Sequence, residues 1–221
     1  MNPIYWIGGS LLLLLCVSVF LYSLSGSGSC VVLRRIPTTN GVVELVAPDC
    51  FEGLPHTTDG NTIRMTEDVW NSGRREEILV HERVHLDQKR RPDPWAAFYK
   101  SEWDYDLSNT PPPGLLATLR LNPDTASTPY ATWRSRYVFF TEQALDGRIR
   151  GAPTRVWDRQ RRAYCDPPSE WRAFFCDGSA GGKGCPHQWE HPHELSAEYL
   201  TLGSDAPAAQ TLRVWQKSLP T

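Results

Sequence analysis

The histidine pair His81 and His85 limits what this chain can fold into more than any other feature. Both lie within residues 78–88, and Glu82 directly follows the first of them. Residues four apart in an α-helix lie on the same face, about one turn from each other. Two imidazoles placed in this way can bind a Zn²⁺ ion, and the adjacent glutamate can act as a general base toward water at the metal. The pattern therefore requires a helix here and a third ligand from elsewhere in the chain.

The neighbouring residues predict that helix. Residues 71–72 are favourable N-cap residues, and the acidic residues 76–77 stabilise a first turn through the helix dipole. Basic residues 89–91 favour the last turn, and Pro92 ends the helix. We therefore expect a helix that presents both histidines on one face.

Residues 192–199 contain the best candidates for the missing ligand. Glu194 and Glu198 are four apart, so both carboxylates share one face of a helix predicted over residues 191–202. One carboxylate can bind the metal while the other accepts a hydrogen bond from a ligand histidine and fixes its orientation. Other possible third ligands are His191, His193, Glu102 and Glu142.

Together the two motifs resemble those of the gluzincin-type zinc metallopeptidases, and within them the branch that contains the catalytic domain of anthrax lethal factor. That branch combines His-Glu-x-x-His with a later helix of the form Glu-x-x-Ala-Glu, matched here by residues 81–85 and 194–198. The match covers about ten residues. The resemblance implies a zincin-like α+β domain with one catalytic Zn²⁺ held by His81, His85 and Glu194, with Glu82 as general base and Glu198 as partner of a ligand histidine.

The resemblance also implies a mechanism. Zinc polarises the scissile carbonyl group and lowers the pKa of a bound water, and Glu82 moves the water proton to the leaving amine. A further donor steadies the oxyanion, and tyrosine is common for this in related peptidases. The candidates are Tyr137 and Tyr199, together with Tyr130 and Tyr164. Gln88, three residues after the second histidine, is a smaller resemblance to secreted or envelope-associated bacterial metallopeptidase-like families.

The predicted function is a membrane-anchored zinc metallopeptidase acting on a peptide or protein substrate. A second hypothesis is a non-catalytic structural or interaction protein on a zincin scaffold, for example a membrane-anchored envelope or virion component. Glu82 favours the enzyme, because a structural zinc site needs no general base. A third hypothesis is a zinc-independent, membrane-anchored binding module, in which the whole constellation is a coincidence. The net charge of −2 gives no indication of nucleic acid as a partner.

The first residues predict attachment to a membrane. Residues 4–24 contain no charged residue and no proline, and 21 such residues in a helix span about 31 Å, the thickness of a bilayer core. We expect a single-pass anchor and a short tether over residues 1–29, with a cleaved signal peptide as the alternative. Basic residues 34–35 would keep the domain cytoplasmic. The cysteines instead favour the extracytoplasmic or lumenal side, which we expect.

Five of the six cysteines lie outside this apolar segment. Their loop-like surroundings suit disulfides in an oxidising compartment. We expect one disulfide between Cys30 and Cys50, and a second between two of the three cysteines Cys165, Cys176 and Cys185. A second zinc site formed by Cys176, Cys185 and His187 is the alternative.

Residues 30–221 are expected to form one domain, with a Cys- and Pro-rich insertion around residues 147–190. Nine tryptophans and eighteen prolines predict a loop-rich fold with aromatic anchors. Asn40-Gly41 between two β-branched runs predicts a hairpin, and residues 61–66 predict a strand that can pair with an extended substrate. Further helices are predicted over residues 95–105, 133–145 and 208–219, and loops or irregular chain over 47–61, 109–124 and 147–183.

Overall fold

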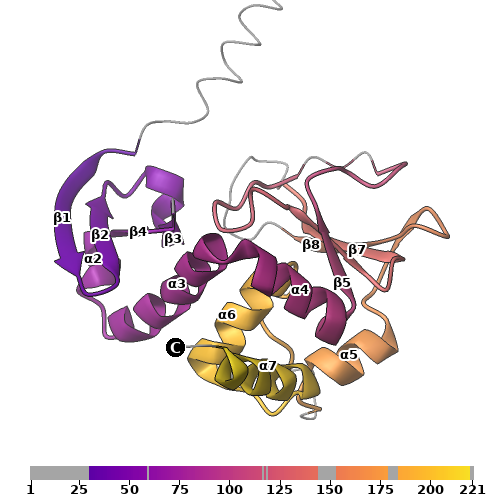
Figure 1. The fold of residues 1–221 in the computed structure, drawn as a ribbon. Coiled ribbons are helices and arrows are strands. Elements are labelled where there is room, and N and C mark those ends of the chain that lie inside the picture. Colours follow the sequence, from indigo (N-terminus) through magenta and orange to yellow (C-terminus); the bar gives the residue numbers. More distant parts are fainter. Residues whose placement is uncertain are drawn as a thin grey trace, which may run out of the picture.

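The computed structural model describes residues 30–219 except 59, 116, 118, 144–152 and 179–183. The described chain forms an α+β fold, in which α3 and α4 lie between two sheets, with α6 and α7 below them (Figure 1). Its helices are η1 (Cys50–Gly53), α2 (Glu67–Trp70), α3 (Arg75–Arg90), α4 (Pro92–Trp103), α5 (Ser169–Phe175), α6 (Pro192–Leu202) and α7 (Pro207–Ser218). Its strands are β1 (Val32–Thr38), β2 (Gly41–Val46), β3 (His56–Thr57), β4 (Thr62–Thr66), β5 (Tyr105–Ser108), β6 (Tyr130–Trp133), β7 (Tyr137–Thr141), β8 (Thr154–Asp158) and β9 (Ala163–Cys165).

Sheet A has the strand order β1-β2-β4-β3. The predicted hairpin is confirmed, because β1 and β2 pair antiparallel around Asn40 and Gly41. Gly41 has a φ of +142°, and a Cβ atom there would collide with the backbone of Asn61, so only glycine fits this turn. The inner face of the sheet packs against α3 through a cluster of aliphatic side chains: Val43, Leu45, Ile63, Met65, Leu79 and Leu86.

The strand predicted over residues 61–66 is confirmed as β4, and strands of the same sheet pair with it on both sides. β4 lies inside sheet A, with β2 parallel on one side and β3 antiparallel on the other. The outer side of β3 is also occupied, because the backbone N–H of Thr57 donates to Asp124 Oδ1 at 2.9 Å. The predicted pairing of an extended substrate with β4 is therefore blocked by β3 at Ile63 and Arg64.

The helix that carries the histidine pair is α3. It begins at Arg75, after the predicted caps, because residues 67–70 form the separate short helix α2, in which Thr66 Oγ1 accepts from the N–H of Val69. Asn71 ends α2 instead of starting α3. Pro92 ends α3 as predicted and directly begins α4, where its fixed φ suits a first helical turn.

The largest core is aromatic and lies between α4, sheet B and the C-terminal helices. The predicted helix over residues 95–105 is α4, whose Trp95, Phe98, Tyr99 and Trp103 are at most 2 % exposed. Trp215 of α7 stacks on Phe98 with ring centroids 4.5 Å apart. The tryptophans are therefore the aromatic anchors that the composition predicts.

The helix predicted over residues 133–145 is wrong. In their described part, residues 133–143 contain the end of β6, the turn and the strand β7 of a hairpin, in the antiparallel sheet B of order β5-β6-β7-β8-β9. Arg134 and Ser135 have φ of 49° and 55°, the left-handed conformation of a tight hairpin turn. Neither is glycine or asparagine, so the sequence carries no turn signal here.

The insertion predicted around residues 147–190 contains regular secondary structure in its described part. This part contains β8, β9 and α5, although irregular chain was expected over 147–183. β8 pairs with β7, and Trp171 and Phe175 of α5 lie in the aromatic core. The described part of this stretch therefore packs into sheet B and the aromatic core.

Among the described residues there are two disulfides, Cys30–Cys50 and Cys176–Cys185, and Cys165 is a free thiol. The first pairing is the one predicted, and the second joins two of the three remaining cysteines. Because Cys176 and Cys185 are bonded to each other, the alternative zinc site that includes His187 is excluded.

The structure contradicts the predicted membrane-spanning helix. No helix in the described part of the chain is long and apolar enough to cross a bilayer. The longest, α3, has 16 residues and carries charged side chains around its surface. Residues 4–24, on which the prediction rested, lie outside the described residues. The fold class is corrected to an α+β fold without a spanning helix among the described residues, and the single-pass anchor and its extracytoplasmic side are not supported.

Candidate metal centre

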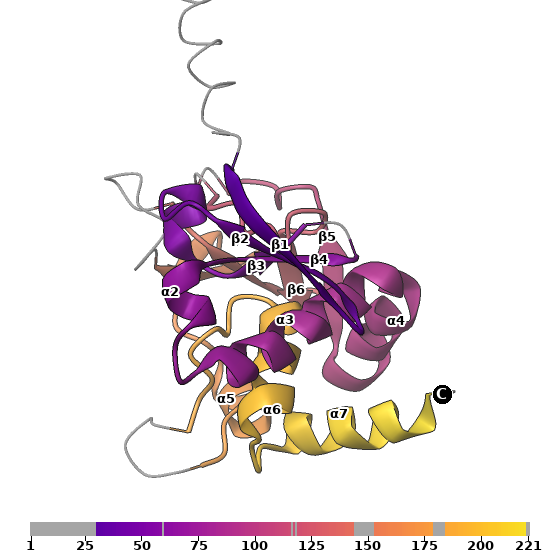
Figure 2. The same cartoon turned by 90° about the vertical axis from the view of Figure 1, so that its left-hand side faces the viewer.

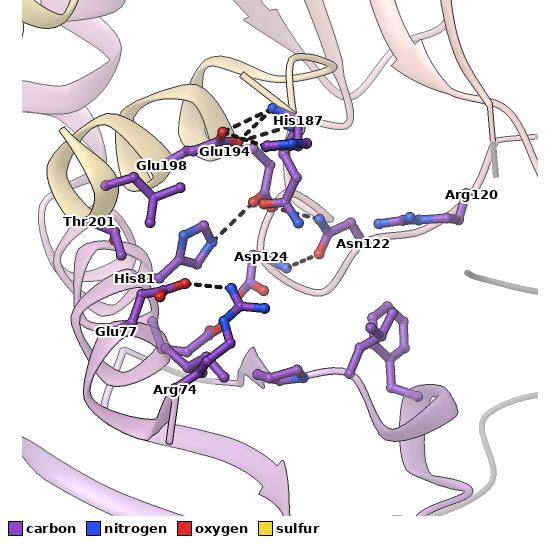
Figure 3. A pocket seen from close by; sticks show the side chains of 17 residues that line it. Arg74, Glu77, His81, Arg120, Asn122, Asp124, His187, Glu194, Glu198 and Thr201 are labelled. Atoms are coloured by element: carbon purple, nitrogen blue, oxygen red, sulfur yellow. Dashed lines mark hydrogen bonds and ion pairs between the residues drawn. The ribbon is translucent and has the colours of Figure 1, made fainter. Parts of the chain in front are cut away.

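The three predicted zinc ligands lie together on two helices that pack against each other. Figure 2 shows α6 beneath α3, and the two helices are in contact. His81 Nε2 and His85 Nε2 are 3.1 Å apart, and each lies 3.4 Å from Glu194 Oε2. Figure 3 shows His81 and Glu194 directed toward each other across the helix interface. The structure therefore brings the three residues to one point.

The spacing of these atoms suits one zinc ion. Tetrahedral zinc binds nitrogen and oxygen ligands at about 2.0–2.2 Å, so any two ligand atoms lie roughly 3.3 Å apart. The three observed separations are 3.1, 3.4 and 3.4 Å. Two imidazole nitrogens and one carboxylate oxygen also form the ligand set of catalytic zinc sites that keep a fourth position open. The residues present therefore fit a Zn²⁺ ion.

A buried amide orients His85. The Nδ1 atom of His85 lies 2.7 Å from Gln88 Oε1, and Gln88 is 2 % exposed. The amide nitrogen of Gln88 donates to the carbonyl of His193 at 3.1 Å and to the hydroxyl of Ser196 at 2.8 Å. Gln88 therefore joins α3 to α6 at the level of the ligands, and leaves Nε2 of His85 for a metal.

Glu194 is oriented by a residue from a distant loop. Asn122 Nδ2 donates to Glu194 Oε1 at 2.7 Å, which leaves Oε2 facing the two histidines. Glu194 also lies in the first turn of α6, where the helix dipole stabilises a negative charge. The carboxylate is 2 % exposed, so both effects act with little screening by water.

Charges within the centre offset the cost of burial. Burial alone would lower the pKa of His85, but the carboxylates of Glu194 and Asp124 raise it to about 10. Burial would raise the pKa of Glu194, yet His85 and His81 hold it well below its usual range. Without a metal, the centre is thus a buried imidazolium–carboxylate cluster, in which a divalent cation can take the place of the proton.

Glu82 is placed to handle a proton. Its side chain lines the same cleft as His81 and Glu194, and it is 4 % exposed. Its Oε2 atom has no hydrogen-bond partner among the described residues. Burial, and after it the charge of Asp124, raise the pKa of Glu82 well above its usual range. A raised pKa makes this carboxylate a stronger proton acceptor than an exposed glutamate, as a general base requires.

The centre opens into a cleft of about 630 Å³. The size is typical of sites that bind an extended small ligand or several residues of a peptide. Figure 3 shows Arg120, Asn122 and Asp124 on one side of the cleft and the α6 residues on another. The apolar lining consists of Phe51, Leu54, Pro55, Ile78 and Leu202, and further polar lining of Arg74, Glu77, His187, Gln188, Glu198 and Thr201.

Lys89 links α3 to the loop over residues 122–124, which lines the cleft. Its Nζ atom donates to the carbonyls of Thr57 at 2.8 Å and Pro123 at 3.0 Å, and lies 3.3 Å from Asp124 Oδ1. These contacts hold the loop over residues 122–124 against α3 and β3. The same loop carries Asn122, so Lys89 indirectly supports the partner of Glu194.

Glu198 does not have the predicted role. It lies one turn after Glu194 on α6 and lines the cleft, but its carboxylate accepts from the backbone N–H groups of His187 and Gln188. Among the described residues it makes no hydrogen bond to His81. Gln88 and Asn122 instead hold the predicted ligands.

The predicted oxyanion donors also lie elsewhere. Within the described part of the chain, no tyrosine lines the cleft. Tyr199 is 3 % exposed and its hydroxyl donates to the carbonyl of Phe175 in the aromatic core. Tyr137 lies on sheet B and packs against Trp133. The remaining candidates, Tyr130 and Tyr164, pack against Phe140.

The rival third ligands do not reach the centre. His191 caps α6, with its ring accepting from the N–H of His193, and its other nitrogen faces the carbonyl of Thr128. His193 is buried beside Tyr99. Glu102 is exposed on α4, and Glu142 pairs with Arg155.

Sequence reasoning missed Asn122 and Asp124, because they lie in a predicted loop with no local pattern that connects them to either motif. Gln88 was noted only by resemblance. Its position three residues after His85 on the same helix was a usable signal, since such residues are neighbours on the helix surface.

Comparisons with protein families, with curated proteins and with solved structures find no match to this chain. The gluzincin resemblance therefore rests on the two short motifs alone.

Proposed function

We propose that this chain is a zinc-dependent hydrolase that cleaves peptide bonds. The observation that carries the proposal is the placement of His81, His85 and Glu194 at tetrahedral spacing in the same centre as Glu82, whose buried Oε2 atom has no hydrogen-bond partner among the described residues. A structural zinc site is normally closed by four protein ligands. Here two of the three ligand residues, His81 and Glu194, line an open cleft together with the proton acceptor Glu82, which favours catalysis.

Each residue of the centre would have a distinct role in peptide hydrolysis. His81, His85 and Glu194 would hold one Zn²⁺, which when bound lowers the pKa of a water ligand and polarises a carbonyl group. Glu82 would accept the proton of the attacking water at its carboxylate and donate it to the leaving amine. Several side chains that line the cleft carry nitrogen donors that could contact an oxyanion or a substrate carbonyl: Arg74, Arg120, Asn122, His187 and Gln188.

A peptide is the substrate class that the cleft favours. The apolar side formed by Phe51, Leu54 and Ile78 can receive a side chain, and the polar side can bind backbone groups. An open cleft of this volume accommodates several residues of an extended chain.

The test is to purify the protein and measure bound zinc and the cleavage of a diverse peptide library by mass spectrometry. We expect one zinc per chain, and cleavage that is lost in Glu82→Gln while zinc remains. Glu102→Gln, an exposed residue of α4, is the matched control and should cleave like the wild type. Stoichiometric zinc without cleavage of any library peptide would favour a non-catalytic zinc protein instead.

A further inference from the structure

We propose that residues 185–188, of which His187 and Gln188 line the cleft, form a substrate-contacting wall and that Glu198 is the positioning residue that holds this wall in place. The inference rests on the proposed function, because it treats the cleft as the peptide site. It gives the second carboxylate of α6 a role that does not involve the metal.

The contacts of Glu198 are those of a residue that anchors a loop. Its two carboxylate oxygens lie 2.9 and 3.0 Å from the backbone nitrogen of His187, and Oε2 lies 3.1 Å from that of Gln188. His187 Nδ1 lies 3.2 Å from the same group. The side chain of Glu198 is 13 % exposed. A carboxylate that accepts several N–H bonds is fully satisfied, so these donors, and not a metal, account for its position.

The wall is also fixed on both sides of these contacts. Upstream, the Cys176–Cys185 disulfide tethers it to the end of α5, and the N–H of Asp177 donates to the carbonyl of Gly184 at 2.9 Å. Downstream, Trp189 packs against Trp171, with ring centroids 5.8 Å apart. Between these two points, the hydrogen bonds of Glu198 connect the wall to α6, the helix that also carries Glu194.

The side chains of the wall remain available to a ligand. His187 and Gln188 both line the cleft, and the His187 side chain is 89 % exposed. Figure 3 shows His187 beside Glu198 at the end of the cleft nearest α6. With Nδ1 held by Glu198, the other ring nitrogen is left for a polar group of a bound peptide. The wall thus offers an imidazole and a primary amide, which suit the backbone carbonyls and N–H groups of an extended chain.

This arrangement predicts an effect on substrate binding more than on chemistry. Glu198→Ala removes every acceptor of the wall amides, whereas Glu198→Gln keeps one carbonyl oxygen. We expect Glu198→Ala to raise KM about tenfold with kcat changed less than about threefold, and Glu198→Gln to recover part of the loss. The double variant C176S/C185S should raise KM in the same direction, and Glu102→Ala should change neither constant.

The experiment combines peptide kinetics with hydrogen–deuterium exchange and zinc analysis on the full protein. Faster exchange of the amides of residues 185–190 in Glu198→Ala, with zinc content unchanged and KM raised, supports the proposal. Unchanged exchange in these residues, or a fall in kcat with unchanged KM, overturns it. If the wild type binds zinc but cleaves no peptide, the proposed function fails, and the exchange comparison still decides whether Glu198 holds the wall.

Discussion

The side chain of Gln88 determines which nitrogen His85 presents to the metal centre. His85 Nδ1 lies 2.7 Å from Gln88 Oε1, and Gln88 Nε2 lies 3.1 Å from the backbone carbonyl of His193. A carbonyl can only accept, so the Gln88 amide must place its nitrogen toward His193 and its oxygen toward His85. His85 Nδ1 is therefore the donor, and its Nε2 lies at the metal centre. Partners of this kind fix the tautomer and orientation of ligand histidines.

Substitution of Gln88 should therefore weaken zinc binding without removing a ligand. We expect Gln88→Leu to lower zinc affinity by about 10- to 100-fold, the usual effect of losing the partner of a ligand histidine. Gln88→Glu keeps an acceptor for His85 but places a carboxylate against the carbonyl of His193, so it should also bind more weakly. Competition with a chromophoric chelator measures both affinities. Gln210→Leu, an exposed glutamine of α7, is the control, and equal affinities in Gln88→Leu and in this control would contradict the role of the amide.

Asn122 should have a comparable effect on the other side of the centre. Its amide donates to Glu194 Oε1 at 2.7 Å. Asn122→Leu removes this bond, and we expect zinc affinity to fall about tenfold. Asn122→Asp places a second carboxylate against Glu194, which raises the pKa of the pair. The Asp variant should therefore lose more affinity at pH 6 than at pH 8, as measured by chelator competition at both values. A pH-independent loss would show that like-charge repulsion is not the cause.

The parts of the site that were predictable are those governed by helix geometry. A spacing of four places His81 and His85 on one face of any helix, and the same rule places Glu194 and Glu198 together. The meeting of α3 with α6 was inferred from ligand chemistry, since two histidines need a third ligand. None of these inferences requires knowledge of the rest of the fold.

The parts of the site that were not predictable depend on which residues from distant parts of the sequence lie next to the two motifs in the fold. Asn122 comes from the loop between β5 and β6 of sheet B. Residues 185–188, which contact Glu198, begin at the Cys176–Cys185 disulfide. Helical spacing could show that Glu198 shares a face with Glu194, but not which donors lie in front of that face. Tyr199 is the neighbour of Glu198 in sequence, yet it points into the aromatic core because adjacent helical residues lie about 100° apart.

Zinc binding should release protons, because His85 is protonated in the metal-free protein at neutral pH. The carboxylates around it raise its pKa to about 10 against the opposing effect of burial. A ligand imidazole must be neutral at Nε2, so a metal must displace that proton. We expect release of about one proton or more per zinc at pH 7, and an affinity that rises with pH up to the pKa of His85. Calorimetry in two buffers of different ionisation enthalpy measures the number, and His85→Ala serves as the negative control. Zinc binding without proton release would contradict the charged state of the cluster.

Acid stability should depend on Asp158, which lies far from the metal centre on sheet B. Its carboxylate receives two bonds from Arg136, at 3.1 and 2.6 Å, and the N–H of Gln160 at 2.9 Å, and it is 1 % exposed. Arg136 is the main cause that lowers the pKa of Asp158 to about 2, against the opposing effect of burial. The pKa of an aspartate in the unfolded chain is about 3.9, so this stabilisation is fully present above about pH 4 and is lost as pH falls toward 2.

We expect Asp158→Asn to lower the free energy of unfolding at pH 7 by roughly 1–2 kcal/mol. The difference from wild type should shrink between pH 4 and 2, as measured by urea denaturation across this range. Asp106→Asn, a substitution of a partly exposed aspartate on the same sheet, should show little loss at either pH. A constant difference between wild type and Asp158→Asn from pH 7 to 2 would mean that the ionised carboxylate is not the source of the stability.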